Sequence, residues 1–483
     1  MSPTASALLA LAAISAPHLP LAPELIAQAP PAPSPPAPRP ADPRPNFVLV
    51  LLDDAGWGDF ACYGNWHVQT PRIDRMAAEG TLFTRFYVSS PVCSPSRVAL
   101  LTGTYPARLG VHGVSWGSAE AGMGDEPAEA SWLTQVLKDA GYRTGHFGKW
   151  HLGHPQRGPK PETYGVEDHR TLVSSSPGWT QRDNAWIAHG DEHIFDEALR
   201  FLDESDGRPF YLNIWSPTPH TPIAPSEEQM NVGHYRNRKA KGLDGPLERF
   251  PTPIRQYDAA LTELDRQLGR LLDRLDKLGL AESTLVLLTS DNGPENLVPR
   301  RNASVGLTGP FRGRKRSLYE GGVRVPCVVR WPGTVPAGRV SDGVFAAVDW
   351  MPTVCALAGA GLPEGGAPDG LDVGELLRGG EVTRSRPLFW EYRFDQGGRI
   401  PLNRSPLLAA GEERWKLLMN PDGSRLELYD LAADPMEVDN VAREHPEVVE
   451  RLREELLAFQ RGLPEGPHAE EAGGIGYRGP LVR

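Results

Sequence analysis

The stretch NFVLVLLDD, residues 46–54, has the pattern of a buried β-strand that ends in two acidic residues. Its apolar run is nearly continuous, as expected for a parallel strand that is covered on both faces of its sheet. Similar short apolar runs alternate along the chain with amphipathic helical stretches, which is the pattern of an α/β fold. We therefore expect a large, mostly parallel sheet that is flanked by helices.

Three more apolar runs lead into polar side chains, as the first one does. The expected strands are residues 143–147, 210–215 and 284–289. The polar residues that follow them are Lys149 and His151, then His220, and then Asp291 and Asn292. In an open α/β sheet, ligands bind outside the carboxyl ends of the strands. If the four strands are parallel, these side chains meet Asp53 and Asp54 at one edge of the sheet and form a site there.

The helices between these strands have recognisable features. Residues 73–79 follow Thr70 and Pro71, which suit the N-cap and the first helical position. Residues 132–140 form a second expected helix. Residues 254–278 keep apolar side chains at three- and four-residue spacing, which predicts a long helix.

The residues at two of these strand ends offer hard oxygen ligands, which suit Ca²⁺ or Mg²⁺ better than zinc. They are Asp53, Asp54, Asp291 and Asn292. Adjacent carboxylates repel each other unless a cation lies between them. A simpler alternative is that Asp53 forms a turn or a helix cap and that Asp54 is solvated. The second acidic strand end favours a metal site.

The stretch CSPSR, residues 93–97, precedes an apolar run that stops at Gly103. Pro95 suits the first turn of a helix, so Cys93 is expected near a helix N-terminus, where backbone amides attract an anion. Arg97 lies four residues further on, on the same helix face, and can hold that anion or its attached nucleophile. From these residues alone, Cys93 is either a thiolate nucleophile of low pKa or a structural cysteine.

Residues 93–103, CSPSRVALLTG, closely resemble the signature of the type I sulfatases, a formylglycine-dependent family of the alkaline-phosphatase superfamily. The stretch GHFGKWHLG at residues 145–153 resembles the second signature of the same family. Further matches occur in the family's order at Asp53-Asp54, at Pro219-His220, at residues 290–293 and in the run KRSLYEGGVRVP, residues 315–326. The patterns WKL at 415–417 and LYDL at 428–431 are similar to the family's small second domain. Within the family, the chain looks similar to arylsulfatases and N-acetylgalactosamine sulfatases.

The resemblance implies a modified nucleophile and a bound metal. Cys93 would be oxidised to formylglycine by a formylglycine-generating enzyme, and the hydrated aldehyde would attack the sulfur of a sulfate ester. The implied ligands of one Ca²⁺ are Asp53, Asp54, Cys93, Asp291 and Asn292.

The same resemblance assigns roles to the cationic and histidine residues. Arg97 would stabilise the nucleophile, while Lys149 and Lys315 would neutralise sulfate oxygens in the transition state. His220 would protonate the departing alcohol, and His151 would take a proton from the second hydroxyl so that sulfate is expelled. Taken singly, each histidine also suits a hydrogen-bonded structural role, and Lys315 suits a place on the surface.

Several residues stay outside this catalytic set. Arg108, His112, Trp116 and His146 are interpreted as packing or pocket residues, and the sequon at Asn302 as incidental. Cys327 and Cys355 lie in apolar runs, where a free cysteine behaves as a small hydrophobic residue. If Cys93 is consumed, at most one disulfide can form among the remaining cysteines.

The chain divides into four expected segments. They are an export signal at residues 1–29, a Pro-rich linker at 30–45, a catalytic domain at 46–380 and, at 381–483, a C-terminal α+β subdomain with an antiparallel sheet. The apolar run 5–16 is too short to span a membrane, and residues 27–29 resemble a signal-peptidase site. No Lys or Arg precedes Arg39, so the basic start of a secretory signal is missing. We expect export to the periplasm or the extracellular space.

The charge of the chain limits its partners. The formal net charge of −11 argues against a nucleic-acid partner, which usually requires a basic surface. It does not exclude an anionic substrate, because the local field of a site steers the ligand. No later segment is long and apolar enough to cross a bilayer. The expected partners are a sulfated small molecule or glycan and the formylglycine-generating enzyme.

Two other functions fit parts of the pattern. A phosphodiesterase or phosphonate monoester hydrolase of the same superfamily could also use formylglycine, although Lys149, His151 and Lys315 favour sulfate. A non-catalytic protein that binds sulfated glycans would keep Cys93 as a thiol. The expected pocket walls are the loops 115–130, 156–184, 222–249 and 393–406. Their Arg, His and Trp residues suit a sulfated sugar, and galactose-type or N-acetylgalactosamine-type polysaccharides match best.

Overall fold

The computed structural model describes residues 44–114, 129–153, 158–173, 184–232, 252–295, 305–362, 367–393 and 403–464. The expected export signal and nearly all of the expected linker lie outside these residues. The same is true of Trp116, of the sequon at Asn302 and of most of the four expected pocket loops. What was predicted for those segments stays a prediction.

The fold is centred on a nine-stranded sheet with the order β4-β3-β5-β1-β6-β7-β2-β8, in which β9 pairs with β2. The strands are β1 (Asn46–Leu52), β2 (Thr81–Tyr87), β3 (Arg143–Lys149), β4 (Asp168–Leu172), β5 (Phe210–Trp215), β6 (Thr284–Ser290), β7 (Arg324–Arg330), β8 (Arg339–Ser341) and β9 (Phe345–Ala346). Strands β4, β3, β5, β1 and β6 run parallel, whereas β7 is antiparallel to both β6 and β2. The prediction of a large, mostly parallel sheet is confirmed.

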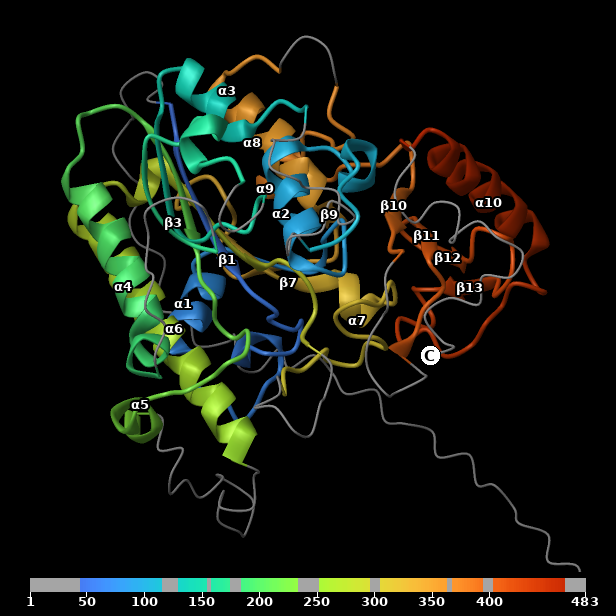
Figure 1. The fold of residues 1–483 in the computed structure, drawn as a ribbon, viewed down its shortest axis with the longest axis horizontal. Helices are drawn as coiled ribbons and strands as arrows, with labels where there is room; N and C mark the ends of the chain where they lie inside the picture. Colours follow the sequence, from blue (N-terminus) through green and yellow to red (C-terminus); the bar gives the residue numbers. More distant parts are fainter. Residues whose placement is uncertain are drawn as a thin grey trace, which may run out of the picture. The chain divides into compact units, whose positions relative to one another are not determined.

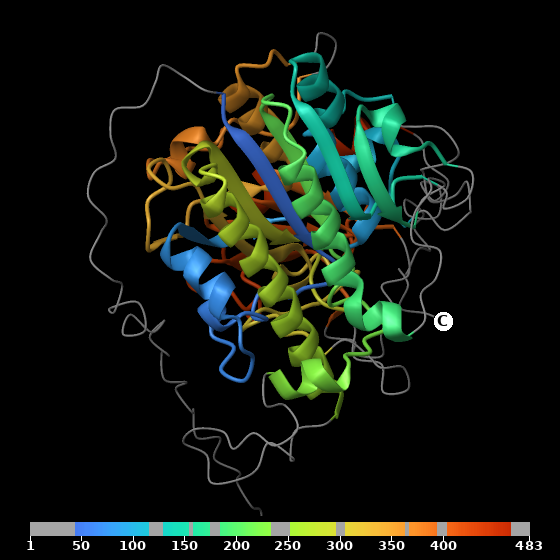
Figure 2. The same cartoon turned by 90° about the vertical axis from the view of Figure 1, so that its left-hand side faces the viewer.

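Helices cover both faces of this sheet. The α-helices of this part are α1 (Pro71–Ala78), α2 (Cys93–Thr102), α3 (Leu133–Asp139), α4 (Asn184–Asp203), α5 (Glu227–Val232), α6 (Thr252–Lys277), α7 (Glu320–Val323), α8 (Trp350–Ala358) and α9 (Gly374–Leu377). Short 3-10 helices are η2 (Ala61–Tyr63), η3 (Pro106–Leu109), η5 (Pro161–Tyr164), η7 (Ala281–Ser283) and η8 (Ala347–Asp349). Helices α1, α4 and α6 lie on one face of the sheet, and α2, α3 and α8 lie on the other (Figure 1, Figure 2).

Strand β1 explains why its sequence is apolar without interruption. All of its residues are buried. Leu49 and Leu51 belong to the apolar core that contains α2 and α8, whereas Val48 and Val50 belong to the core that contains α4 and α6. Successive side chains of a strand point to opposite faces, so a strand with a core on each side needs apolar residues throughout.

Helix α1 begins where the sequence predicts but is capped differently. Thr70 occupies the N-cap position, yet its hydroxyl makes no capping hydrogen bond. Instead, the carboxylate of Asp265 on α6 accepts hydrogen bonds from the backbone N–H groups of Arg72 at 2.9 Å and Ile73 at 2.7 Å. The predicted N-cap position of Thr70 and first helical position of Pro71 are confirmed, but a side chain from a neighbouring helix satisfies the free N–H groups in place of the Thr70 hydroxyl.

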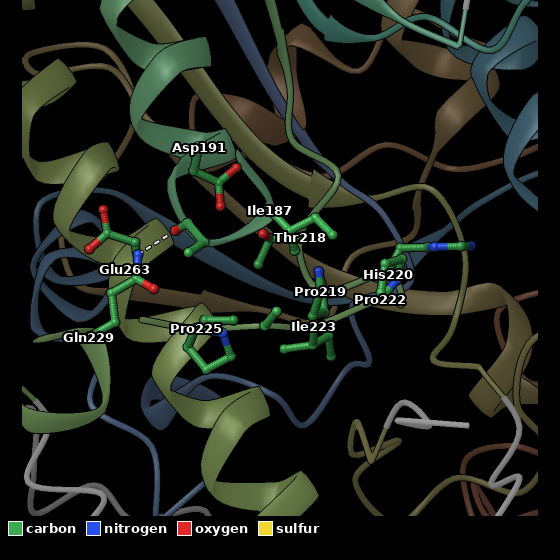
Figure 3. Close-up of a pocket in the computed structure, with 13 residues that line it drawn as sticks. Ile187, Asp191, Thr218, Pro219, His220, Pro222, Ile223, Pro225, Gln229 and Glu263 are labelled. Carbon is green, nitrogen blue, oxygen red and sulfur yellow. Dashed lines mark hydrogen bonds between the residues drawn. The ribbon is translucent and has the colours of Figure 1, made fainter. Parts of the chain in front are cut away.

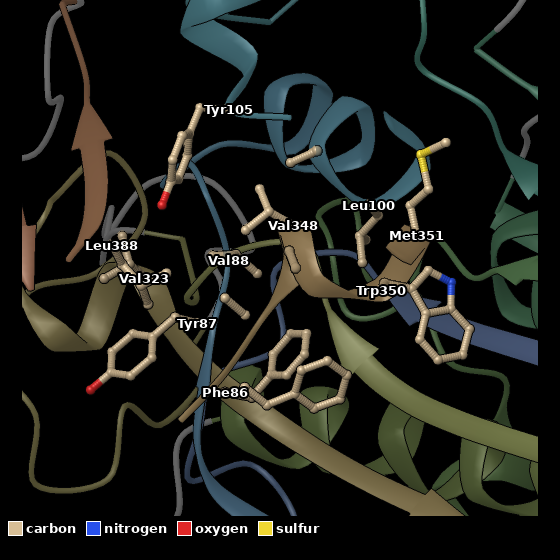
Figure 4. Packing of buried hydrophobic residues seen from close by; sticks show 14 of the residues in the cluster. Phe86, Tyr87, Val88, Leu100, Tyr105, Val323, Val348, Trp350, Met351 and Leu388 are labelled. Carbon is tan, nitrogen blue, oxygen red and sulfur yellow. The ribbon is translucent and has the colours of Figure 1, made fainter. Parts of the chain in front are cut away.

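A second, antiparallel sheet of four strands follows in the order β10-β11-β12-β13. Its strands are β10 (Leu388–Glu391), β11 (Leu408–Gly411), β12 (Trp415–Met419) and β13 (Glu427–Asp430), and helix α10 (Pro446–Arg461) follows them. Leu408 of β11 belongs to the same apolar core as Leu100 of α2. Figure 4 shows part of this core, which also contains Leu388, Val88 and Val323. The predicted α+β subdomain with an antiparallel sheet is confirmed, whereas the position of the domain boundary stays a prediction.

The remaining expectations concern cysteines and membrane segments. The four cysteines are all free, and Cys327 and Cys355 are fully buried in an apolar core. Their interpretation as small hydrophobic residues is confirmed. Among the helices that the structure describes, none is long and apolar enough to cross a membrane.

Candidate active site

Seven of the predicted site residues lie at the carboxyl ends of four neighbouring parallel strands, in the order β3-β5-β1-β6. These residues are Lys149 and His151 at β3, His220 after β5, Asp53 and Asp54 after β1, and Asp291 and Asn292 after β6. Lys149 is itself the last residue of β3 rather than the second residue beyond it. The parallel arrangement thus brings together side chains from four separate parts of the sequence.

Side chains from β1, α2 and β6 form a buried cluster of Asp53, Asp54, Cys93 and Asp291. One ligand atom from each residue lies within 4.8 Å of every other. The backbone of Asp54 has a φ of 68°, in the left-handed region that Asp tolerates better than most residues. In this conformation the Asp54 N–H donates a hydrogen bond to Asp291 Oδ1 at 3.2 Å, which joins the ends of β1 and β6.

Asn292 lies beside the cluster and contacts it through its side-chain amide. Its side-chain N–H group donates to Asp54 Oδ1 at 2.7 Å and to the Gly293 carbonyl oxygen at 2.8 Å. Its Oδ1 is buried and accepts no hydrogen bond from the residues that the structure describes. A buried acceptor left unsatisfied costs about 1–3 kcal/mol, so this oxygen suits a bound ligand. Carboxylate and amide oxygens are the ligands that hard divalent cations prefer, and the residues present fit such an ion.

Cys93 is the first residue of α2, and its Sγ lies 3.4 Å from Asp53 Oδ1. Burial, reinforced by the negative charge of Asp291, raises the pKa of this thiol well above its ordinary value. The direction of this shift favours a protonated thiol over a thiolate of low pKa in an unmodified Cys93. In an oxidised residue, an oxygen atom would take the place of the Sγ.

Arg97 lies one helical turn beyond Cys93 and holds Asp291. Its Nε and Nη2 donate to Asp291 Oδ2 at 3.1 Å and 2.6 Å, and its Nη1 donates to the Lys149 carbonyl oxygen at 2.7 Å. The guanidinium group lies 5.0 Å from the centre of the Trp215 ring. Burial lowers the pKa of Arg97, but Asp291 outweighs this effect and the net shift is upward, so the group is ionised.

Two lysines direct their ammonium groups at the aspartates after β1. Lys149 Nζ donates to Asp53 Oδ2, and Lys315 Nζ donates to both carboxylate oxygens of Asp54 at 2.6 Å and 2.8 Å. Burial raises the pKa of Asp53, but the charges of Lys149 and its neighbours outweigh burial and hold that pKa well below its usual value. Lys315 is only 3% exposed, which contradicts the alternative that it is a surface lysine.

The two predicted catalytic histidines occupy different environments. His151 is buried, and burial, followed by the charge of Lys149, holds the pKa of its imidazole well below the ordinary value. The side chain of His220 is 34% exposed, and its Nε2 lies 3.7 Å from Asp54 Oδ2. Its Nδ1 lies 2.6 Å from the Thr221 carbonyl oxygen, so Nδ1 carries a hydrogen and Nε2 faces the cluster.

His146 and Arg108 are interpreted from the sequence as packing or pocket residues, and their contacts are those of packing residues. His146 lies against the rings of Trp150 and Trp215, with ring centres 4.7 Å and 4.8 Å away. Arg108 pairs with Asp369 at 2.9 Å. Neither residue belongs to the cluster around Cys93.

Two acidic partners are not predicted from the sequence. Glu295 lies 3.9 Å from Lys315 Nζ and also pairs with Arg316. Glu295 lies two residues after Gly293, and the basic run at residues 312–316 follows later in the chain. These two features together could have indicated a pairing of Glu295 with the basic run. Glu391 lies 3.2 Å from His112 Nδ1, and no local signal connects a residue at the end of β10 with this histidine.

Comparison with known proteins identifies the family to which this site belongs. The family model described as Sulfatase matches residues 45–360. The chain belongs to the sulfatase family. A second model, described as N-sulphoglucosamine sulphohydrolase, C-terminal, matches residues 311–462 and covers the antiparallel sheet.

The sulfatase also resembles curated proteins over most of its length. It is 34% identical over 381 residues to the N-acetylgalactosamine-6-sulfatase of Canis lupus familiaris, covering 72% of this chain and 69% of that protein. It is 29% identical over 505 residues to the N-acetylgalactosamine-6-O-sulfatase of Bacteroides thetaiotaomicron, covering 85% and 92%. The crystal structure of Ps i-CgsB in complex with k-i-k-neocarrahexaose matches with a TM-score of 0.72 at 24% identity, over 87% of this chain and 94% of that one. This last likeness supports the fold.

Sulfatases are sulfuric ester hydrolases, and this chain accordingly hydrolyses sulfate esters. The family uses formylglycine and a divalent metal, and the clustered ligands around Cys93 fit such a metal. The recognition of a type I sulfatase from its sequence is confirmed. The roles of the individual side chains stay predictions.

Proposed function

We propose that this sulfatase removes sulfate from a carbohydrate by means of a formylglycine made from Cys93 and one bound Ca²⁺. The observation that carries the proposal is that four ligand groups, Cys93 among them, lie within 4.8 Å of one another at the carboxyl edge of the sheet. The unsatisfied Oδ1 of Asn292 adds a neutral oxygen donor. Ca²⁺ is favoured because it accepts about six to eight oxygen ligands in a flexible geometry.

The cation and the formylglycine each supply one kind of chemistry when they are present. A divalent cation supplies positive charge, which stabilises an anionic nucleophile and polarises the ester. Formylglycine supplies an aldehyde whose hydrate provides the nucleophilic oxygen. The proposed ligands of the cation are Asp53, Asp54, Asp291 and Asn292, together with residue 93. Arg97 keeps Asp291 in place through its two hydrogen bonds.

Lys149 and Lys315 are proposed to bind the sulfate group. Their ammonium groups lie at Asp53 and Asp54, two of the three aspartates of the cluster, so a sulfate group bound beside residue 93 would meet both lysines. Their positive charge stabilises sulfate oxygens that become more negative in the transition state, and this effect is largest in a buried site. Glu295, at 3.9 Å, helps to orient Lys315.

The two histidines are proposed to move protons in opposite directions. His220 is partly exposed at the rim of the cluster, where its Nε2 can protonate the oxygen of the leaving alcohol. The Thr221 carbonyl oxygen fixes the ring through Nδ1. His151 is neutral at pH 7 because burial lowers its pKa, and a neutral imidazole can accept a proton while sulfate is released.

The carbohydrate substrate is inferred from the relatives. Both curated relatives described above are N-acetylgalactosamine-6-sulfatases. We therefore propose a galactose-type or N-acetylgalactosamine-type sulfated polysaccharide, which the enzyme meets after export from the cytoplasm. Maturation by a formylglycine-generating enzyme belongs to the same proposal, because burial raises the pKa of the Cys93 thiol and so disfavours the reactive thiolate.

Expression of the full chain together with a formylglycine-generating enzyme tests the mechanism. Mass spectrometry of the peptide that contains residue 93 should find the aldehyde. The matured enzyme should release sulfate, and much less phosphate or phosphonate, from paired aryl esters. Preferential release of phosphate or phosphonate would support the alternative hydrolase of the superfamily. An unmodified thiol together with no activity would overturn the proposal and favour a glycan-binding protein.

A panel of defined sulfated oligosaccharides tests the substrate. We expect the highest kcat/KM on sulfate esters of galactose or N-acetylgalactosamine. A preference for sulfated glucosamine, or for a steroid sulfate, would contradict this substrate class and leave the mechanism intact.

A further inference from the structure

A pocket lies beside His220, between α4, α6 and the turn that follows β5 (Figure 3). Its polar lining residues are Asp191 of α4, Gln229 of α5, Glu263 of α6, and Thr218 and His220 of the turn. Asp191 is buried and has no part in the mechanism proposed above. Its contacts lead to the turn that carries His220.

Asp191 holds the first half of this turn. Its carboxylate accepts a hydrogen bond from the Ser216 hydroxyl. The Ser216 hydroxyl oxygen accepts a hydrogen bond from the Thr218 backbone N–H at 2.9 Å. Asp191 and Ser216 are both buried, so these hydrogen bonds are shielded from water.

The same turn is attached on its other side to the active-site cluster. The Thr218 carbonyl oxygen accepts a hydrogen bond from the Asp53 backbone N–H at 3.2 Å. The His220 backbone N–H donates to the Pro217 carbonyl oxygen at 2.9 Å, which ties His220 to these attached residues. The turn therefore lies between Asp191 on the side of α4 and Asp53 at the end of β1.

We infer that Asp191 is a positioning residue, which fixes residues 216–220 and so holds His220 Nε2 where it can protonate the leaving alcohol. The inference rests on the proposed function, because it takes His220 as the acid. Without the carboxylate of Asp191, the buried hydroxyl of Ser216 would lose its acceptor, and the turn would shift to satisfy it. A displacement of about 1 Å in a catalytic group can cost about a hundredfold in rate.

The leaving group of the substrate reports on this proton transfer. A nitrophenolate departs without a proton, whereas the alkoxide of a sugar needs one in the transition state. A displaced His220 should therefore lower kcat/KM strongly for a sugar sulfate and weakly for 4-nitrophenyl sulfate. A general loss of folded enzyme, or of the metal site, would lower both values by the same factor.

The experiment compares Asp191→Ala, Asp191→Asn and His220→Ala in the full, matured enzyme with both substrates. We expect Asp191→Ala to lose at least about tenfold more activity on the sugar sulfate than on 4-nitrophenyl sulfate, with the same preference as His220→Ala. Asp191→Asn keeps an oxygen acceptor for Ser216 and should remove most of this difference. Asp265→Ala is the matched control, since Asp265 is also a buried helix carboxylate but caps α1, and it should affect both substrates equally.

Each outcome of this experiment decides a different point. Equal losses on both substrates in Asp191→Ala, with His220→Ala still selective, would overturn the inference and leave the proposed function intact. A His220→Ala variant without selectivity would overturn the role of His220 itself. If Asp191→Ala does not fold, Ser216→Ala takes its place, because it removes the hydroxyl that links Asp191 to the turn. A selective loss in that variant supports the inference, and equal losses overturn it.

Discussion

The buried charges at the carboxyl edge of the large sheet and those between α7 and β12 are arranged in different ways. The second group, here called the α7–β12 cluster, consists of Tyr87, Glu320, Arg324, Lys416 and Glu437. Lys416 Nζ lies 2.8 Å from Glu320 and 3.1 Å from Glu437. Glu320 also accepts hydrogen bonds from Tyr87 at 2.8 Å and Arg324 at 3.2 Å, and Glu437 accepts one from the Glu320 backbone N–H at 2.6 Å. Both oxygens of Glu320 accept hydrogen bonds, whereas Glu437 Oε1 has only the ion-pair contact to Lys416 and accepts no hydrogen bond from the described residues.

The cluster around Cys93 is equally buried but is arranged differently. Its three aspartates and Cys93 place ligand atoms within 4.8 Å of one another. The Oδ1 of Asn292 accepts no hydrogen bond from the described part of the chain. Buried ionic networks also occur without any function in catalysis, so buried charge by itself does not mark an active site. What distinguishes the active-site cluster is that ligand atoms from four residues, three of them carboxylates, converge within 4.8 Å of one another.

The largest effect that tests this comparison is expected from Cys93→Ala. The variant cannot form formylglycine, so sulfate release should fall by about a thousandfold or more, as when other covalent nucleophiles are removed. The stability should change little, because the thiol contributes a weak contact of 3.4 Å to Asp53. Sulfate release and thermal unfolding of the same preparation measure both quantities. A loss below about tenfold would show that the cluster works without residue 93 as its nucleophile.

Lys416→Met should act on stability instead of activity. It leaves Glu320 and Glu437 buried without their cation, which should lower the free energy of unfolding by about 3–5 kcal/mol. Denaturant unfolding measures this loss, and kcat/KM per folded molecule should stay near that of the wild type. A loss of activity in Lys416→Met with an unchanged free energy of unfolding would contradict a purely structural role for the α7–β12 cluster.

The free energy of unfolding should depend on pH through Glu437 of the α7–β12 cluster. Burial raises the pKa of this carboxyl from its ordinary 4.5 to about 7, although Lys416 opposes the shift. The folded state thus holds the proton more tightly than the unfolded state. This stabilisation is complete below pH 4.5 and is lost as the pH rises to about 7.

In Glu437→Gln the group cannot titrate. The fall in unfolding free energy between pH 4.5 and about 7 should therefore be smaller than in the wild type, by up to about 3 kcal/mol. Denaturant unfolding at several pH values gives the slope for both proteins. Identical slopes would contradict the assignment to Glu437.

The smallest effect, and the one that sharpens the comparison most, is expected from Ca²⁺. An ion that binds only the folded state stabilises it by about 2.7 kcal/mol at a hundred times its Kd. Adding Ca²⁺ to the chelator-treated, matured enzyme should raise its Tm. Asn292→Ala should need more Ca²⁺ for the same rise because it loses an oxygen ligand, whereas Lys416→Met should respond as the wild type does. A Tm that does not depend on Ca²⁺ would contradict the choice of this ion.

Much of the site could be predicted because the topology around it is simple. An uninterrupted apolar run such as Asn46–Leu52 marks a strand with a core on both faces. Parallel neighbours then bring their carboxyl ends to one edge, so Asp53 and Asp291 could be expected together despite their separation in the sequence. The place of Cys93 at the start of α2 followed in the same way from Pro95.

Contacts that arise only when helices pack could not be predicted. Asp265 replaces Thr70 as the cap of α1 because α6 passes beside the start of that helix. Asp191 reaches Ser216 from α4, across the contact between a helix and the sheet. An acidic residue on an amphipathic helix usually faces water, and the sequence around Asp191 and Asp265 carries no sign that these two do not.

All ten residues of α2, from Cys93 to Thr102, are buried in the folded protein. If Cys93 is oxidised as proposed, the oxidising enzyme can reach it only before this helix docks onto the sheet. Folding and oxidation then compete for every newly made chain, and the result is permanent, because a copy that folds first keeps its thiol out of reach. The share of working enzyme in a cell is therefore set during biosynthesis by the relative speeds of two processes, and no later supply of the oxidising enzyme can correct it.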